Sequence, residues 1–209
     1  MRPPAELTVL IEPRPLQRFL AAAIGQYKAL TPLEPRPCFA VLLGRIDGGT
    51  AHIQDLDFGG NARASDPSAV EEFAASIVPK FGAAYENPVR GYWLDSRDLL
   101  RISRRADDLA LDILGSIHMH PDWHRIGPPP AESMPLSEQP TSMDEYVFGS
   151  TLWPVNVICY LERLGESLCY SLRAWGQPGD PPGGCPALPL RIRTDLPSTI
   201  PEHQEVTVP

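Results

Sequence analysis

The stretch between Leu109 and Pro121 constrains the fold more than any other part of the sequence. An apolar run, Leu109 to Leu114, leads into the segment Gly115-Ser116-Ile117-His118-Met119-His120-Pro121. This pattern predicts a buried β-strand, in which residues two apart project from the same face. His118 and His120 would therefore lie side by side at the end of that strand, an arrangement that suits one small metal ion.

A third, anionic ligand is predicted downstream, in the segment Pro140-Thr141-Ser142-Met143-Asp144. Thr141 can cap a helix that begins here, which places Asp144 in the first helical turn. Three protein ligands that leave one position open are typical of a catalytic zinc site rather than a structural one. The sequence therefore predicts a zinc site formed by His118, His120 and Asp144.

The hydrophobic pattern of the remaining chain predicts a mixture of strands and helices. Strands are expected at Leu7–Glu12, Cys38–Gly44, Ala51–Phe58, Val89–Leu94, Val155–Arg163 and Ser167–Trp175, and helices at Leu16–Leu30, Ser68–Phe81, Ser96–Ala110 and Thr141–Phe148. The tetrad Asp47-Gly48-Gly49-Thr50 is typical of a hairpin turn, and Ser68 is expected to cap the second helix. This order of elements predicts an α+β domain with α/β/α layers.

Prolines separate the predicted domain from its connections. The chain of 209 residues contains 25 prolines, and they are frequent in residues 121–140 and 178–209, where regular helices and central strands are not expected. We expect one domain over residues 1–176, with a proline-rich insertion at residues 122–140. Residues 177–209 are expected to form a proline-rich, partly ordered tail, in which Leu188–Arg193 could add an edge strand.

Charge and cysteine usage narrow the class of partner and the compartment. A formal net charge of −8 argues against binding to nucleic acid or to an anionic membrane surface, both of which need basic stripes. No apolar run is long enough for a signal peptide or a membrane span. The four cysteines, Cys38, Cys159, Cys169 and Cys185, show no CxxC spacing and are expected to be reduced, buried thiols. These features predict a cytoplasmic protein.

Three segments together resemble the JAMM/MPN-domain metalloproteases: Leu42-Leu43-Gly44-Arg45, His118-Met119-His120-Pro121 and Pro140-Thr141-Ser142-Met143-Asp144. They occur in the order found in that family, and the resemblance extends roughly from Leu7 to Trp175. It implies a JAMM/MPN-like central mixed sheet flanked by helices, an architecture similar to that of the cytidine deaminases. It also implies that a zinc-bound water attacks an amide or isopeptide carbonyl, while Thr141, in place of the family's serine, assists the oxyanion.

The chain departs from the family pattern at the position of the general base. Pro37 stands where the family has a glutamate, and proline can neither accept a proton nor hydrogen-bond through its side chain. Glu34, three residues earlier on the same segment, is the preferred candidate for the base. Glu132 and Glu138, which lie on the insertion, are the other candidates.

The loop after His120 is the second departure, because it is about a dozen residues longer than the short loop usual in the family. Long loops in compact domains are often functional, so the insertion is expected to act as a lid or to contact the substrate. Trp123 lies in this loop beside the predicted metal ligands and is the aromatic residue expected to contact the substrate.

The resemblance implies hydrolysis of the amide or isopeptide bond at the C-terminus of a ubiquitin-like protein, whose extended tail could lie as an added strand beside the site. The alternative is a catalytically inactive MPN-type module that scaffolds a complex or binds a ubiquitin-like partner, which Pro37 favours. A phosphoesterase with a His-x-His pair is disfavoured, because such sites recruit several more ligands. The other histidines, His52, His124 and His203, lie in unrelated contexts.

Overall fold

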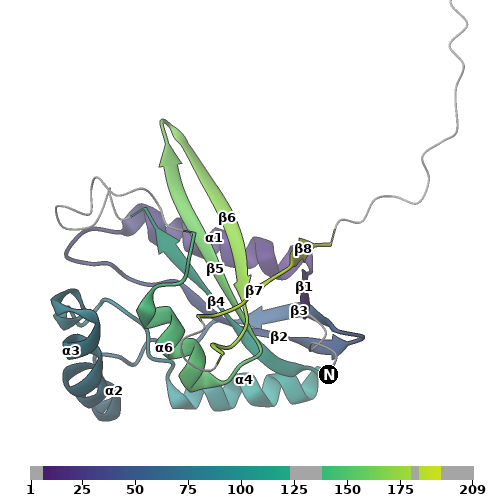
Figure 1. Ribbon diagram of the computed structural model, residues 1–209, viewed down its shortest axis with the longest axis horizontal. Helices are drawn as coiled ribbons and strands as arrows, with labels where there is room; N and C mark the ends of the chain where they lie inside the picture. Colours follow the sequence, from purple (N-terminus) through teal and green to yellow (C-terminus); the bar gives the residue numbers. More distant parts are fainter. Residues whose placement is uncertain (1–6, 123–137, 180–183, 194–209) are drawn as a thin grey trace, which may run out of the picture.

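The architecture is a mixed α+β fold built around one curved sheet (Figure 1). A computed structural model describes residues 7–122, 138–179 and 184–193. Within these residues eight strands form a mixed sheet in the order β7-β6-β5-β4-β2-β3-β1-β8. The expected α+β class is confirmed by this arrangement.

The strands occupy the positions predicted from the hydrophobic pattern, with one exception given below. Their bounds are β1 (Thr8–Ile11), β2 (Phe39–Asp47), β3 (Thr50–Asp57), β4 (Asp112–Pro121), β5 (Val155–Leu164), β6 (Ser167–Trp175), β7 (Ala187–Leu188) and β8 (Leu190–Ile192). The β2–β3 turn has positive φ at Gly48 and Gly49, as the predicted hairpin requires. Strand β4 lies in the middle of the sheet, antiparallel to β2 and parallel to β5.

The residues after β6 nearly close the sheet. Strand β7 pairs with β6 at one edge, and β8 pairs with β1 at the opposite edge. Only Pro189 separates these two short strands, and its carbonyl accepts a hydrogen bond from the Val9 amide (2.8 Å). The predicted edge strand at Leu188–Arg193 is therefore divided between both edges of the sheet, where it pairs with part of β6 and part of β1.

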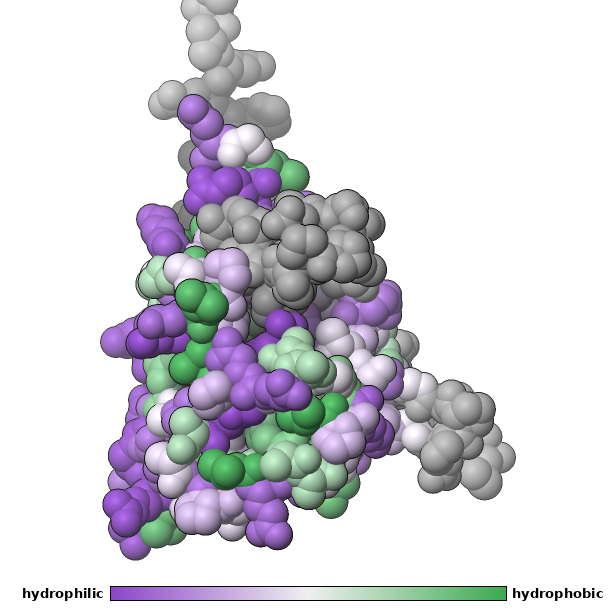
Figure 2. All heavy atoms as spheres, turned by 90° about the vertical axis from the view of Figure 1, so that its left-hand side faces the viewer, coloured by the Kyte–Doolittle hydropathy of each residue, from purple (hydrophilic) through white to green (hydrophobic). Residues whose placement is uncertain are grey.

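Helices cover the two faces of the sheet (Figure 1). Their bounds are α1 (Pro13–Ala29), α2 (Pro67–Glu72), the π-helical turn η1 (Phe73–Ile77), α3 (Val78–Phe81), the 3-10 turn η2 (Ala83–Glu86), α4 (Ser96–Asp108) and α6 (Ser142–Thr151). Helix α1 lies on one face, while α4 and α6 lie on the other. The side of the molecule that carries α2 and α3 shows hydrophobic side chains interspersed with hydrophilic ones (Figure 2).

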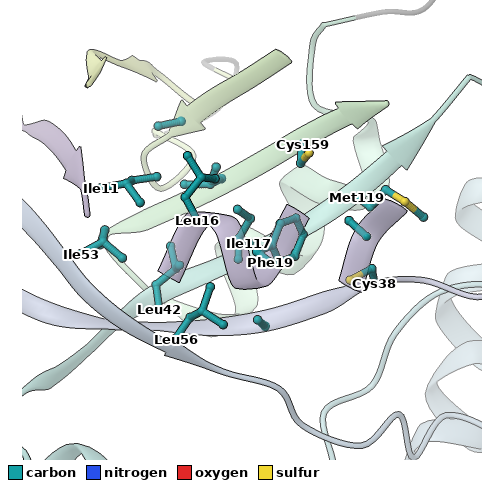
Figure 3. Packing of buried hydrophobic residues seen from close by; sticks show 14 of the residues in the cluster. Ile11, Leu16, Phe19, Cys38, Leu42, Ile53, Leu56, Ile117, Met119 and Cys159 are labelled. Atoms are coloured by element: carbon teal, nitrogen blue, oxygen red, sulfur yellow. The ribbon is translucent and has the colours of Figure 1, made fainter. Parts of the chain in front are cut away.

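The main core lies between α1 and the sheet. Phe19 and Leu16 of α1 pack against strand residues such as Leu42, Ile117 and Ile53 (Figure 3). Proline at the first position of α1 and apolar residues at helical spacing explain why this segment forms an amphipathic helix. On the opposite face, separate clusters form around Ile102 of α4 and around Phe148 of α6.

A β-bulge in β4 sets the face on which its side chains lie. Leu43 pairs with Ile113 and Leu42 pairs with Gly115, so Leu114 is the extra residue. Ile113 packs towards α4, whereas Leu114 and Ile117 both belong to the main core beneath α1. Because side chains alternate along a strand, these three residues could not lie in this way without the shift at Leu114.

The predicted helix at Ser68–Phe81 is interrupted, and Ser68 does not cap it. Asp66 is the N-cap and accepts hydrogen bonds from the amides of Ser68 (2.8 Å) and Ala69 (3.3 Å). The π-helical turn η1 precedes Pro79, which has no backbone N–H, so a regular helical hydrogen-bond ladder cannot continue through this point.

The predicted strand at Val89–Leu94 is wrong. Only an isolated bridge between Asn61 and Leu94 is present there. Pro88 precedes the segment, and Gly91 has φ of 86°, which interrupts an extended backbone. The segment is a loop, and its backbone is held by hydrogen bonds to Asn61 and Ala62.

All four cysteines are free, as expected, but they are not all buried. Cys169 is exposed, because the half of β6 nearest the hairpin turn extends beyond the layers that cover the sheet. Among the helices of the described residues, none is long and apolar enough to cross a membrane.

We predict that Gly115→Ala destabilises the fold by about 3 kcal/mol or more. A Cβ atom at Gly115 would overlap the carbonyl oxygen of Val155, so β4 and β5 would have to separate. The measurement is the free energy of unfolding in urea. Gly25→Ala is the matched control: it lies in α1 with open space around the added methyl group and should stabilise the protein by about 1 kcal/mol. Equal stability of the two variants would contradict the pairing described here.

Candidate metal centre

The two predicted histidine ligands lie on the central strand of the sheet. His118 pairs with Phe39 of β2 on one side and with Ile158 of β5 on the other, and His120 pairs with Tyr160. The end of the strand is held by a hydrogen bond from the Met119 amide to the Cys38 carbonyl (3.0 Å). The backbone of His118 is therefore paired on both sides, and that of His120 is paired with β5.

The imidazoles and the predicted carboxylate converge on one point. The Nε2 atoms of His118 and His120 are 3.0 Å apart. Asp144 places Oδ1 3.1 Å from His118 Nε2 and Oδ2 3.3 Å from His120 Nε2. The sequence prediction that these three side chains meet is confirmed.

Asp144 is positioned by the first turn of α6. Thr141 is the N-cap, and its hydroxyl accepts a hydrogen bond from the Asp144 amide (3.2 Å). In return, Asp144 Oδ2 accepts hydrogen bonds from the Thr141 amide (2.6 Å) and from the Thr141 hydroxyl (2.7 Å). This reciprocal pattern is a capping box, and it holds the carboxylate in one orientation at the positive end of the helix.

Burial and these hydrogen bonds favour the protonation states that a metal ligand needs. Burial lowers the pKa of His118 below its ordinary value, although the neighbouring Asp144 opposes this effect. Burial alone would raise the pKa of Asp144, but hydrogen bonds with His118 and His120 hold that pKa well below the usual range for an aspartate. A neutral imidazole and an ionised carboxylate are the forms that bind a metal ion.

Aromatic side chains hold the imidazole rings in place. The centroid of the His118 ring lies 6.1 Å from the centroid of the Phe148 ring. The centroids of the His120 and Tyr160 rings are 5.5 Å apart, and these two rings are in edge-to-face contact. Both histidine side chains remain about 15% exposed, with 16% for His118 and 15% for His120. The ligands are therefore held rigidly but remain accessible.

The three ligands form part of the wall of a pocket of about 160 Å³. Its wall also includes apolar residues, two tyrosines, two arginines and three prolines: Leu30, Phe39, Met119, Met143, Val147, Phe148, Tyr85, Tyr92, Arg36, Arg90, Pro35, Pro37 and Pro121. Among the described residues that line the pocket, Asp144 carries the one carboxylate.

The geometry fits a small divalent cation. Ligand atoms in a tetrahedral zinc site lie about 3.3 Å apart when each is about 2.0–2.1 Å from the metal. The two Nε2 atoms lie 3.0 Å from each other and 3.1 and 3.3 Å from one or the other Asp144 oxygen, and one ligand atom from each side chain lies within 4.8 Å of the others. The largely buried His118-His120-Asp144 group could therefore bind a metal ion, and the pocket beside it gives space for a further ligand.

The candidates for the general base lie in different places. Glu34 is exposed and does not line the pocket, but its carboxylate is 3.0 Å from the guanidinium of Arg36, which does. Glu34 therefore lies near the rim. Glu138 accepts hydrogen bonds from Ser171 (2.6 Å) and Arg173 (3.1 Å) on β6 and is not part of the pocket wall.

Other predicted residues lie outside the site or outside the described part of the chain. Trp123, Glu132, His124 and His203 fall within residues that the structure does not describe. His52 is on β3, where it pairs with Arg45, and takes no part in the histidine cluster.

Sequence reasoning missed the residues that complete the pocket. Tyr85, in the turn η2, and Arg90 come from the connection between α3 and α4, part of which was expected to be a strand.

Asp122 was assigned to the insertion, yet it is fully buried and accepts hydrogen bonds from the Tyr27 hydroxyl (2.8 Å) and the Arg163 amide (3.0 Å). An acidic residue directly after a buried strand was the one available signal for this contact.

Comparisons with known proteins address the fold and not the site. No family model matches the sequence, and no curated protein matches it. Among solved structures, the chain is similar to the solution structure of protein DSY2949 from Desulfitobacterium hafniense, with 15% sequence identity and a TM-score of 0.53. The similarity covers 91% of this chain and 96% of that one. At this level of identity the two proteins share a fold, and nothing follows about a shared activity.

We predict that wild-type protein takes up zinc, used as the probe ion, and that His118→Ala lowers the bound zinc to background. The variant removes one of three ligands and leaves two, which are not enough for tight binding. Elemental analysis after dialysis measures the bound metal, and a chelator should lower the Tm of the wild type but leave that of His118→Ala unchanged. His52→Ala is the matched control and should keep its zinc. Undiminished zinc in His118→Ala would show that the cluster is not the binding site.

We predict that Thr141→Val weakens zinc binding by about 10- to 100-fold, because the hydroxyl no longer orients Asp144. Loss of the cap should also destabilise the protein by about 1 kcal/mol. Competition with a chromophoric chelator measures the affinity. Thr141→Ser should retain both properties, and Thr151→Val, at the other end of α6, serves as a control. A Thr141→Val variant with wild-type affinity would exclude a supporting role for the hydroxyl.

Proposed function

We propose that this protein is a zinc-dependent hydrolase of amide or isopeptide bonds, acting at the C-terminus of a ubiquitin-like protein. The observation that carries the proposal is the convergence of His118, His120 and Asp144 in the wall of a pocket of about 160 Å³. The resemblance of these segments to the JAMM/MPN metalloproteases supplies the reaction and the class of substrate. The proposal gains no support from the comparisons, which concern the fold.

Each ligand has a defined task in this proposal. His118 and His120 would hold zinc through Nε2, and Asp144 would supply the negative charge that partly balances the ion. Zinc, when bound, supplies a Lewis acid that polarises a carbonyl and lowers the pKa of water. The apolar part of the pocket wall limits the access of bulk water, which strengthens electrostatic interactions within it.

Thr141 contributes through Asp144 in the arrangement described here. Its one hydroxyl hydrogen is donated to Asp144 Oδ2, so it is not available to an oxyanion at the same time. Assistance to the oxyanion would require this hydrogen bond to be exchanged during the reaction. Orientation of the third ligand is therefore the primary role that we assign to Thr141.

Glu34 remains our candidate for the general base. Its side chain is exposed, and its ion pair with Arg36 is of the exposed kind that contributes about 0–1 kcal/mol. A change of rotamer at the rim is therefore inexpensive, and it would bring the carboxylate towards the pocket. A base in that position would take a proton from the attacking water and pass it to the leaving amine.

The second candidate function is a catalytically inactive module that binds a ubiquitin-like partner or scaffolds a complex. A specific observation favours it: Pro37 lines the pocket at the position of the family's glutamate, and the described lining contains no carboxylate besides Asp144. In this case the metal would stabilise the fold around the partner-binding face, and no bond would be cleaved.

We predict that the zinc-loaded protein cleaves a ubiquitin-like protein with a C-terminal extension, and that His118→Ala abolishes cleavage. Glu34→Gln should lower kcat by about 10²- to 10⁴-fold with unchanged zinc content, because it removes proton transfer and not the metal. Product formation is followed by mass spectrometry. Glu166→Gln, in the β5–β6 turn, removes the same charge elsewhere and should cleave normally.

The same experiment separates the two candidate functions. Equal cleavage by wild type and His118→Ala would contradict a metal-dependent hydrolase. Binding of the fusion without cleavage by any of the proteins would favour the inactive module. Normal cleavage by Glu34→Gln would leave the hydrolase intact and exclude Glu34 as the base.

A further inference from the structure

Two arginines, Arg36 and Arg90, line the pocket beside the candidate metal ligands, and Asp144 is the acidic residue among the described lining. Arg36 is paired with Glu34 at the rim (3.0 Å), whereas the aromatic neighbour of Arg90 is the Tyr85 side chain. A divalent ion held by the ligands would add two positive charges to this pocket. An anionic group is therefore favoured in the pocket, because opposite charges attract strongly where the surroundings are partly apolar.

Arg90 is held in place before any ligand binds. It is partly buried and hydrogen-bonded to the Tyr85 side chain, and its guanidinium lies 5.2 Å from the centre of the Tyr85 ring. The residue after Arg90 is anchored as well, because the Gly91 carbonyl accepts a hydrogen bond from Asn61 (3.0 Å). A guanidinium fixed in this way loses little side-chain entropy on binding a ligand.

Tyr85 is anchored by a second arginine, which does not line the pocket. Arg63 is 5% exposed, donates a hydrogen bond to the Tyr85 carbonyl, and packs over the Phe73 ring at 3.8 Å. The Tyr85–Arg90 pair is thus supported from behind by buried contacts. Binding sites are precise when the residues that touch the ligand are themselves supported in this way.

The Tyr85–Arg90 pair lies close to the metal ligands. Both residues line the same pocket as His118, His120 and Asp144. Burial raises the pKa of the Tyr85 hydroxyl; the charge of Arg90 opposes this effect, and that of Asp144 adds to it. The pocket volume of about 160 Å³ is close to that of a cavity that holds one benzene molecule, about 150 Å³. A ligand small enough to fill this volume while touching both the metal and Arg90 has its anionic group only a few bonds from the atom at the metal.

We propose that Arg90 and Tyr85 form a carboxylate subsite, so that the substrate is a peptide with a free C-terminal carboxylate one residue beyond the bond cleaved. This proposal rests on the proposed hydrolase and names its substrate class: a single-residue extension at a C-terminus. The planar guanidinium fork matches a carboxylate, and the Tyr85 hydroxyl is a further donor. A protein-linked isopeptide offers no free carboxylate at this distance.

Hydrolysis at that position needs no reactant other than the peptide and one water molecule. One water is consumed: its oxygen forms a bond with the acyl carbon, and the C–N bond breaks. The released residue takes both protons of the water on its nitrogen and leaves as an ammonium, and the shortened peptide ends in a new carboxylate. The carboxylate held by Arg90 is unchanged and leaves with the released residue.

The subsite is tested by binding, which does not require catalysis. The probes are N-acetyl-Gly-Gly with a free carboxylate, the same compound as its C-terminal amide, and inorganic phosphate, titrated calorimetrically into zinc-loaded protein. We expect the wild type to bind the acid about 10- to 100-fold more tightly than the amide, the range expected for a hydrogen bond between charged groups. Equal binding of acid and amide, or tighter binding of phosphate than of the acid, would overturn the proposal.

Variants locate the preference at Arg90. Arg90→Gln should lose the preference for the acid while it retains zinc, and Arg90→Lys should keep part of it, because the charge remains without the planar fork. Arg104→Gln, on the exposed face of α4, is the charge-matched control and should bind as the wild type does. An undiminished preference in Arg90→Gln would also overturn the proposal. If Arg90→Gln fails to fold, the difference in affinity between the acid and the amide for the wild type still decides whether the carboxylate subsite exists.

Cleavage assays with the same protein separate this proposal from the proposed function. Arg90-dependent binding of the acid without cleavage of any peptide would support the subsite and contradict the hydrolase. Cleavage that proceeds equally with a free and an amidated C-terminus would support the hydrolase and contradict the subsite.

Discussion

The direction of the side chains along β4 is the constraint on which the candidate site depends. The bulge at Leu114 moves the alternation by one residue, so that Ile117 faces α1 while His118 and His120 face the layer that contains α6. Without this shift, the imidazoles would project into the main apolar core, where no carboxylate could meet them. Pairing with β2 and β5 on both sides then keeps the strand in this register.

One carboxylate connects the helix to the metal centre. Asp144 completes the capping box of α6 with Thr141 and also faces the Nε2 atoms of both histidines. The first turn of the helix and the candidate ligand set consequently stabilise each other, and binding of a metal ion would be linked to the order of this turn. An acid at the N-terminus of a helix is also favoured by the helix dipole, which helps to keep it ionised.

The charge in the pocket differs from that of the whole molecule. The chain has a formal net charge of −8, yet arginines and tyrosines surround the metal ligands. Screening limits the influence of distant surface carboxylates to roughly 10 Å at ordinary ionic strength, so a bound group responds mainly to the residues beside it. The negative net charge of the chain is therefore compatible with a small anionic ligand in this pocket.

The sequence by itself determined the three candidate ligands and most strands and helices, because alternation with period two and helix capping are local properties of consecutive residues. It also indicated that His118, His120 and Asp144 belong together, through their resemblance to one family. Tertiary structure decided the rest. The bulge that orients the histidines arises from pairing with β2, and Arg90 enters the pocket because Gly91 and Asn61 turn a predicted strand into a loop. Closure of the sheet by β7 and β8 joins segments far apart in the sequence, which no local pattern can specify.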